Sequence, residues 1–272
     1  MEMIDFDAYF SDYLNVWVKE NQQRFQNPEE MEDEMPGVYL TFLNTPMPWL
    51  GGATPGTYFD SYTDAGEVCG LLKAYAKSDA PIPDPLLTRL GEMEDEGALL
   101  ALVRDEEAPC EARMHGIDLL RQMESEAPMV DYIRWQAERS QDEDILDNAL
   151  ESLREMGEVA HRPAKIAFLA AGQEGKEALL DILCDFPADD DVFFFALKCF
   201  ESQSEKRGLF AGYLAKLDDD RALEALLEVA ESKTVDYIDF IEIRSAIERL
   251  GSEAPVRDFS KDPTYQAVQR LQ

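Results

Sequence analysis

The sequence is poor in basic residues and in histidine. Its 272 residues hold 25 Lys and Arg against 57 Asp and Glu, which gives a formal charge of -32 and a pI near 4.2. A field of this sign repels phosphate backbones and anionic lipid, so we expect no nucleic acid and no membrane as partners. Two interpretations of the excess carboxylates remain: a solvated surface that keeps the protein in solution, or a surface that attracts a basic protein or peptide.

Cysteine and histidine are too few and too scattered to predict a metal or redox site. The cysteines are Cys69, Cys110, Cys184 and Cys199, and no two of them form a Cys-x-x-Cys pair. His115 and His161 have no second ligand at metal-binding spacing, so we expect no metal and no cofactor. We interpret both histidines as structural or solvated, with proton shuttling as the alternative. Unpaired thiols are typical of a reducing cytoplasm.

Long apolar runs, an export signal and catalytic motifs are also missing. The N-terminal residues show no basic segment followed by an apolar one, and the apolar run 192–197 is far too short to cross a bilayer. The sequence contains no Gly-x-Ser-x-Gly, no His-Glu-x-x-His and no phosphate-binding loop. We therefore expect a cytoplasmic protein that is not an enzyme. A general acid–base pair among the many carboxylates is the open alternative.

The first 85 residues predict a helical cap region. Apolar residues spaced three and four apart predict an amphipathic helix over residues 6–25, which Asn27-Pro28 stops. An acidic helical turn, residues 29–35, precedes Pro36-Gly37, where the pattern predicts a break. Residues 38–43 are predicted as helix or as packed extended chain. We expect the first helix to cover the end of the repeats described below, with docking on a partner or a membrane interface as the alternative.

Prolines, glycines and aromatic residues then alternate over residues 44–64. This composition predicts a long ordered loop that is either functional or held by its own aromatic side chains. A further helix is predicted over residues 65–77, and the proline-rich segment 78–85 marks a soft domain boundary.

Three copies of one apolar phrase recur in the remainder of the chain. The copies begin at Ala98, Ala178 and Ala225, and an apolar residue of a second helical pattern follows each one 22 residues later. These later residues are Leu120, Phe200 and Ile247. The repeated object is therefore a pair of helices, and we expect Leu180 and Leu227, which are equivalent in the phrase, to be buried.

Three of the second helices can be aligned at a constant spacing of 47 residues. Asp142, Asp189 and Asp236 precede them and are predicted as N-caps or first-turn acids. The alignment predicts four buried positions: Leu146, Phe193 and Phe240; Ala149, Ala196 and Ile243; Ser152, Cys199 and Ala246; Leu153, Phe200 and Ile247. A further pair covers residues 128–139 and 142–156, and additional helices are predicted at 163–171 and 206–217. The apolar run 192–200 predicts a helix that is buried on all sides.

Helix pairs of about 33 residues and triplets of about 47 are typical of stacked helical repeats. Over residues 95–259 the chain resembles the HEAT and armadillo repeat families, through phrases such as Ala246-Ile247-Glu248-Arg249-Leu250-Gly251. The resemblance implies an all-α protein whose residues 86–272 form an α–α superhelix, a HEAT/ARM-like solenoid used for protein recognition. Residues 1–85 would form the N-terminal helical cap, either as a separate domain or in one continuous domain with the repeats.

Repeats and charge together predict a non-catalytic interaction scaffold, or a regulatory or immunity-type protein, that binds a basic protein or peptide. The alternative is an enzyme on a HEAT-like repeat fold with a carboxylate-lined cleft. The candidate partner-binding residues lie on the outer side of the helix over residues 142–156: Asp144, Asp147, Glu151 and Glu155. Like charges one helical turn apart repel each other, and a cationic partner would relieve that repulsion. A solvated helix face is the alternative interpretation.

Overall fold

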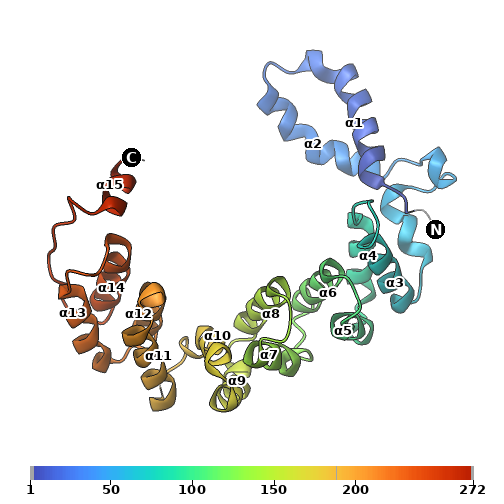
Figure 1. The fold of residues 1–272 in the computed structure, drawn as a ribbon. Helices are drawn as coiled ribbons and strands as arrows, with labels where there is room; N and C mark the ends of the chain where they lie inside the picture. The colour runs from blue at the N-terminus through green and yellow to red at the C-terminus, as the bar shows by residue number, and fades with distance from the viewer. Residues whose placement is uncertain (1–2, 188, 271–272) are drawn as a thin grey trace. The chain divides into compact units, whose positions relative to one another are not determined.

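The computed structural model describes residues 3–187 and 189–270 (Figure 1). All regular elements in these ranges are helices and none is a β-strand, which confirms the all-α prediction. The chain divides into two compact units: Met1–Pro128 with Asp142–Asn148, and Met129–Gln141 with Ala149–Gln272. The boundary expected near residue 85 lies within the first unit, and a separate role for the first 85 residues stays a prediction.

The first unit is built from six α-helices, three short 3-10 helices and the start of α8. The elements are α1 (Phe6–Asn21), η1 (Gln22–Arg24), α2 (Pro28–Leu43), η2 (Pro48–Leu50), η3 (Pro55–Ser61), α3 (Ala65–Tyr75), α4 (Asp84–Met93), α5 (Glu96–Arg104) and α6 (Cys110–Gln122). Helix α3 packs on α4 and α5, and α6 packs on α4 and α5. Leu72, Leu86, Leu90, Leu99 and Ile117 form the fully buried centre of this packing.

The second unit continues with helices that pack both on their neighbours in sequence and on helices two or three places away, such as α12 on α14 and α7 on α10. The elements are α7 (Met129–Glu138), α8 (Glu143–Met156), α9 (Glu158–Ala170), α10 (Gln173–Leu183), α11 (Asp190–Ser202), η4 (Ser204–Lys206), α12 (Arg207–Lys216), η5 (Asp220–Ala222), α13 (Leu223–Glu231), α14 (Tyr237–Arg249) and α15 (Pro263–Gln269). Helix α10 contacts α7, α9 and α11, and α12 contacts α11 and α14. The predicted extra helices are α9 and α12, of which α9 begins earlier than expected, at Glu158.

Many of the carboxylates have a local structural role as helix caps. The Asp189 side chain accepts a hydrogen bond from the Val192 amide at 3.1 Å, and Asp236 accepts one from the Asp239 amide at 2.9 Å. The predicted N-caps Asp189 and Asp236 are confirmed, and the third predicted residue, Asp142, stands directly before α8. Side-chain caps also begin other helices, at Asp5, Asn27, Asp64, Asp95 and Asp262. These side chains satisfy backbone amides that have no partner within the helix.

The predicted break at Pro36-Gly37 is wrong, because α2 continues through both residues. A proline inside a helix removes one backbone hydrogen bond and normally bends or ends the helix. Here both ends of the helix are held. Asn27 caps the first turn, and Val38 and Phe42 are buried in the last turns.

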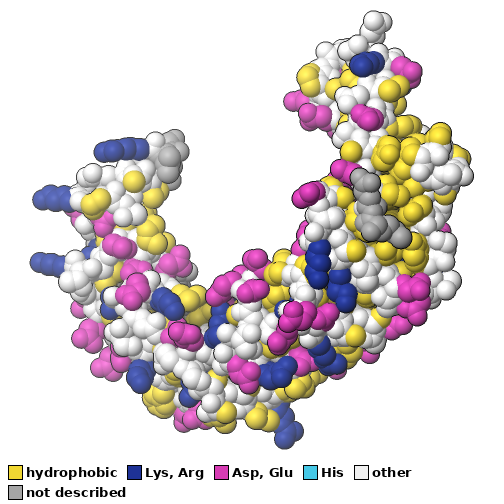
Figure 2. Space-filling view, turned by 45° about the vertical axis from the view of Figure 1, so that its right-hand side comes forward, with side chains coloured by type: hydrophobic (Ala, Val, Ile, Leu, Met, Phe, Trp, Pro, Cys, Tyr) yellow, Lys and Arg dark blue, Asp and Glu magenta, His cyan; other side chains and the backbone are white. Residues whose placement is uncertain are grey.

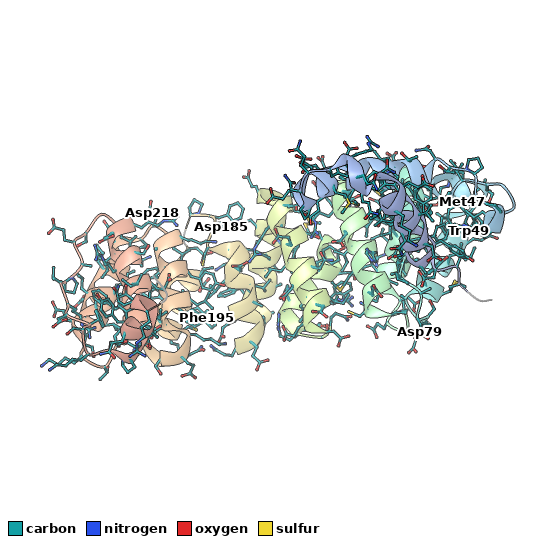
Figure 3. The ribbon with its side chains drawn as sticks, turned by 90° about the horizontal axis from the view of Figure 1, so that it is seen from above. Met47, Trp49, Asp79, Asp185, Phe195 and Asp218 are labelled. Carbon is teal, nitrogen blue, oxygen red and sulfur yellow. The ribbon has the colours of Figure 1, made fainter. Side chains whose placement is uncertain are left out.

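The proline- and glycine-rich segment 44–64 is held by aromatic packing, as one of its two interpretations predicted. It contains η2 and η3, with Met47 and Phe59 buried and Trp49 half-buried (Figure 3). The Trp49 ring stacks on Tyr9 with centroids 3.9 Å apart, and Phe6 contacts Phe59 at 5.7 Å. The start of α1 therefore packs on this segment.

The 47-residue alignment holds at every position that it predicts. The four sets of equivalent residues in α8, α11 and α14 are all buried. The repeated apolar phrase, which lies in α5, α10 and α13, matches the predicted burial less completely. Leu99, Leu179 and Leu226 are equivalent and fully buried, whereas in the next position Leu180 is buried and Leu227 is only half-buried. The expectation for Leu227 is wrong, since α13 turns its preceding leucine toward the core.

Helix α11 is not buried on all sides as predicted. Phe194 is 54% exposed, and Phe195 is half-buried. The Arg221 guanidinium lies 5.2 Å from the Phe194 ring centroid and 4.4 Å from that of Phe193. A cation of this kind lets an aromatic side chain remain at the surface, because the guanidinium interacts with the face of the ring.

Candidate functional site

The four predicted partner-binding carboxylates all lie exposed on α8. The buried residues of the helix are Leu146, Ala149 and Leu153 together with Ile145 and Ser152, while Leu150 is half-buried. Asp144, Asp147, Glu151 and Glu155 are exposed. The amphipathic pattern therefore predicted the solvent-facing side of this helix correctly. Whether a partner binds there stays a prediction.

Arg154, a cation of the protein itself, lies beside Glu151. Arg154 Nη1 lies 2.8 Å from Glu151 Oε2, and Arg154 Nε lies 2.6 Å from Asp181 Oδ2. Tyr213 donates a hydrogen bond of 3.3 Å to Asp181. Burial and the neighbouring Asp181 raise the pKa of Tyr213, so the phenol stays protonated and available as a donor. Glu151 is thus partly neutralised, whereas Asp144 and Asp147 have no ion pair among the described residues.

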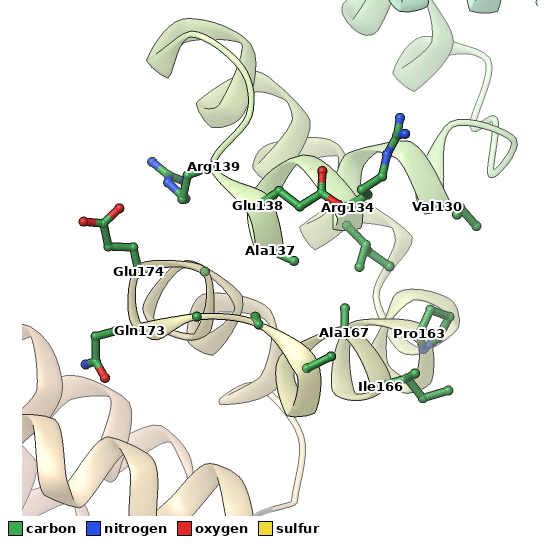
Figure 4. A pocket seen from close by; sticks show the side chains of 15 residues that line it. Val130, Arg134, Ala137, Glu138, Arg139, Pro163, Ile166, Ala167, Gln173 and Glu174 are labelled. Atoms are coloured by element: carbon green, nitrogen blue, oxygen red, sulfur yellow. The ribbon is translucent and has the colours of Figure 1, made fainter.

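The second unit also contains an apolar cleft of about 880 Å³ between α7, α9 and the start of α10 (Figure 4). Its walls carry Ile133 and Ala137 from α7 and Pro163, Ile166 and Ala167 from α9. Ile166 is 63% exposed. Charged residues border the space: Arg134, Glu138, Arg139 and Glu174. Arg134 is paired with Asp131 at 2.8 Å, and Arg139 donates to Gln136 at 2.9 Å.

The cleft exists because α7 and α10 approach closely at one point and small residues line the space beyond it. A side chain at Gly175 would place its Cβ 2.0 Å from the Ala137 carbonyl oxygen, so only glycine fits there. Ala167, Ala170 and Ala171 leave room on the opposite wall. The cleft suits an apolar side chain of a partner. Sequence reasoning missed it, although the alanine-rich run 167–171 was a signal.

A second cleft, of about 720 Å³, lies over α10, α12 and α14 and is lined by both signs of charge. Its carboxylates are Asp181, Glu205, Asp239 and Glu242, and its cations are Lys206, Lys216 and Arg249. Burial, together with Asp236, raises the pKa of Asp239. Asp181 is already held by Arg154 and Tyr213.

The histidines and cysteines do not line either of these two clefts. No group of three or more His, Cys, Asp or Glu residues in the described ranges is arranged to hold a metal ion. His161 packs its ring 4.3 Å from that of Phe186, and the half-buried His115 lines a separate cleft between α4 and α6. The arrangement around His161 matches a structural role.

All four cysteines are free thiols, and three of them are buried. Burial raises the pKa of Cys69 to about 11 and also raises the pKa values of Cys184 and Cys199. A thiol with a raised pKa is a poor nucleophile near neutral pH, because little of it is thiolate. The half-buried Cys110 also has a raised pKa, owing first to burial and then to Asp142 and Asp144.

Within the described part of the chain, no helix combines the length and the apolar character that crossing a membrane requires. Comparison with known proteins gives no match: no protein-family model, no curated protein and no solved structure matches this chain.

Proposed function

We propose that this protein is a non-catalytic interaction protein of the HEAT/armadillo type, a scaffold or a regulatory or immunity-type protein that binds a basic protein or peptide. The equivalent buried positions of α8, α11 and α14 support stacked repeats. Packing of α9 to α12 on their sequence neighbours is also what an α–α superhelix requires. The four free thiols support a cytoplasmic location.

The observation that carries the proposal is the exposed carboxylate face of α8. Of its four acids, Glu151 pairs with Arg154, which is also shared with Asp181. A basic segment that reached this face would find Asp144 and Asp147 without competing ion pairs in the described structure. Electrostatic complementarity of this kind raises the association rate and makes binding sensitive to salt.

The enzyme alternative has less support. The cleft over α10, α12 and α14 contains four carboxylates, but three cations alternate with them. The oxygens of its Asp181 already have partners within the protein, Arg154 and Tyr213. The raised pKa of Asp239 is the one feature that a general acid would share.

The proposal is tested with a flexible basic peptide of about 20 residues made of Lys, Gly and Ser, whose binding is followed by fluorescence anisotropy at about 20 and 200 mM NaCl. The variant D147N/E151Q/E155Q should weaken binding at low salt by about three- to tenfold, because three exposed charges at about 0.2–0.5 kcal/mol each sum to about 0.6–1.5 kcal/mol. Its affinity should also depend less on salt.

The matched control is E224Q/E228Q/E231Q, which removes three exposed carboxylates from α13 and gives the same net charge. The control should bind nearly as tightly as the unaltered protein, and neither variant should lower the melting temperature. Equal weakening by the two variants would mean that net charge alone attracts the peptide, and the α8 site would then be rejected.

A further inference from the structure

The two-helix hairpin formed by α1 and α2 has an apolar seam that the first unit does not cover. None of residues 7–37 is buried, and the structure describes all of them. The side chains of the seam are nevertheless large and apolar. Those that are half-buried are Phe10, Tyr13, Leu14, Trp17 and Val18 from α1 and its neighbours Phe25, Met31 and Met35.

Ring contacts show that these side chains face one another without enclosing a core. The Phe10 and Phe42 centroids lie 5.2 Å apart, those of Tyr13 and Phe42 5.5 Å, and those of Trp17 and Phe25 5.9 Å. Two helices alone cannot remove such a seam from water, because each covers only one side of the other. A third helix would complete the packing.

The hairpin is held firmly enough to present this seam. At its base, Phe6, Val38 and Phe42 are buried, and Tyr39 donates a hydrogen bond of 3.0 Å to Asp84. At its tip, Asn27 accepts from the Glu30 amide at 2.8 Å while the Glu30 carboxylate accepts from the Gln26 amide at 2.9 Å. Reciprocal bonds of this type fix the start of a helix. Figure 1 shows α1 and α2 extending together away from α3 and α4.

Charge determines which partner fits. From residue 5 to residue 43 the hairpin carries nine carboxylates against Lys19 and Arg24. Five of the carboxylates lie in the first turns of α2, and all five are exposed: Glu29, Glu30, Glu32, Asp33 and Glu34. At the top of Figure 2, hydrophobic and acidic side chains of the hairpin share the surface. A second copy of this chain and an anionic membrane would both be repelled, whereas a cationic segment would be attracted.

We propose that the α1–α2 hairpin binds one cationic amphipathic helix of a partner protein. The apolar side of that helix would lie on the seam, and its Lys and Arg residues would face the carboxylates of α2. An amphipathic helix placed on an apolar surface is a common recognition mode. Met31 and Met35 suit it because methionine adapts its shape to different apolar side chains. The surface is separate from the α8 face, and it requires apolar contact as well as charge.

The test uses the full chain and a synthetic peptide of about 18 residues made of Leu and Lys, with the leucines at helical spacing on one side. The control peptide has the same composition in an order that destroys the apolar side. The helical peptide should bind at least tenfold more tightly than the control peptide. Hydrogen exchange should slow on binding for amides within residues 7–43.

Two pairs of variants locate the site. E32Q/D33N/E34Q should weaken binding of the helical peptide about tenfold, while E224Q/E228Q/E231Q, with the same net charge, should not. Trp17→Ala should also weaken it about tenfold, whereas Val16→Ala, at a position 56% exposed on the same helix, should have little effect. Helix content by circular dichroism should be unchanged, since none of these residues is buried.

The outcomes separate this inference from the α8 proposal. Equal binding of both peptides, or binding that the hairpin variants leave unchanged, would overturn the inference while leaving the α8 site standing. Loss of flexible-peptide binding in the α8 variant together with full binding of the helical peptide would support both sites. Failure of the helical peptide to bind the unaltered protein at low salt would reject the hairpin site.

Discussion

At the scale of single residues, two glycines show how differently the same substitution acts in two helices. Gly175 at the start of α10 faces the Ala137 carbonyl oxygen so closely that a Cβ would overlap it at 2.0 Å. Gly212 lies within α12 and is exposed, with nothing within 4 Å of the Cβ that a larger residue would add. Only the first glycine is required by packing.

We predict opposite effects for alanine at these positions. Gly175→Ala should lower the free energy of unfolding by about 1–3 kcal/mol or more, because α7 and α10 must move apart. Gly212→Ala should raise it by about 0.5–1 kcal/mol through lower chain entropy in the unfolded state. Urea unfolding followed by circular dichroism measures both, and a stabilised Gly175→Ala variant would contradict the observed approach of the helices.

The leucines of the repeated phrase give a second contrast. Leu180→Ala and Leu226→Ala should each cost about 2–5 kcal/mol because both side chains are fully buried. Leu227→Ala should cost less, since this side chain is half-buried. If thermal unfolding shows equal losses at Leu226 and Leu227, the orientation of α13 is wrong.

At the scale of helices, the sequence predicted what depends on local periodicity and could not predict what depends on distant contacts. The buried positions of α8, α11 and α14 follow from spacing alone. The continuation of α2 through Pro36 depends on burial of Val38 and Phe42 against the base of the hairpin, which no local pattern records. The acids of α8 were correctly predicted to face solvent, but the Arg154 link to Asp181 joins two helices and escaped prediction. The apolar cleft was missed for the same reason.

The cap of α11 illustrates how one acid stabilises a helix in two ways. Asp189 accepts from the Val192 amide and forms an ion pair with Lys165, which also approaches Asp191 at 3.3 Å. Burial acts to raise the pKa of Asp189, but Lys165 and the backbone donors outweigh burial and leave the pKa below its ordinary value. The ionised form is therefore favoured in the folded protein.

This shift predicts a defined pH dependence. Asp189→Ala should lose about 0.5–2 kcal/mol at pH 7, and Asp189→Asn, which can still cap, should lose about 0–1 kcal/mol. A carboxyl group whose pKa is lower in the folded state stabilises the folded protein at pH values above its unfolded pKa. This stabilisation is lost as the pH falls through the folded pKa. The difference between Asp189→Asn and the unaltered protein should thus shrink as the pH falls through the folded pKa of Asp189, which lies below the ordinary value of a carboxyl group. A difference that grew on acidification would contradict the assigned direction.

At the scale of the whole molecule, the charge of -32 opposes folding, because carboxylates repel one another in any compact state. The ion pairs in the described structure leave this net charge unchanged, because the Lys and Arg residues are already counted in it, and most of the pairs lie at least partly exposed to solvent. Exposed ion pairs contribute little to the free energy of unfolding. Salt weakens these pairs, and it also screens the general repulsion among the carboxylates. With more than two acids for each base, the repulsion is the larger of the two effects.

We therefore predict that added salt stabilises this protein. Raising NaCl from about 10 to 300 mM should increase the melting temperature by about 2–4 °C for each kcal/mol of relieved repulsion. Scanning calorimetry or circular dichroism would measure the change. A melting temperature that fell with salt would show that specific ion pairs outweigh the net charge.

The buried free cysteines can be used as probes of unfolding, because their rates of chemical labelling can be measured. Cys69 belongs to the first unit, Cys184 and Cys199 belong to the second, and all three are shielded from water. An alkylating reagent can modify such a thiol only after the surrounding helices open, so the rate of labelling reports the opening of each unit separately. Mass spectrometry of the labelled peptides would then show whether the two units of this protein unfold together or one after the other.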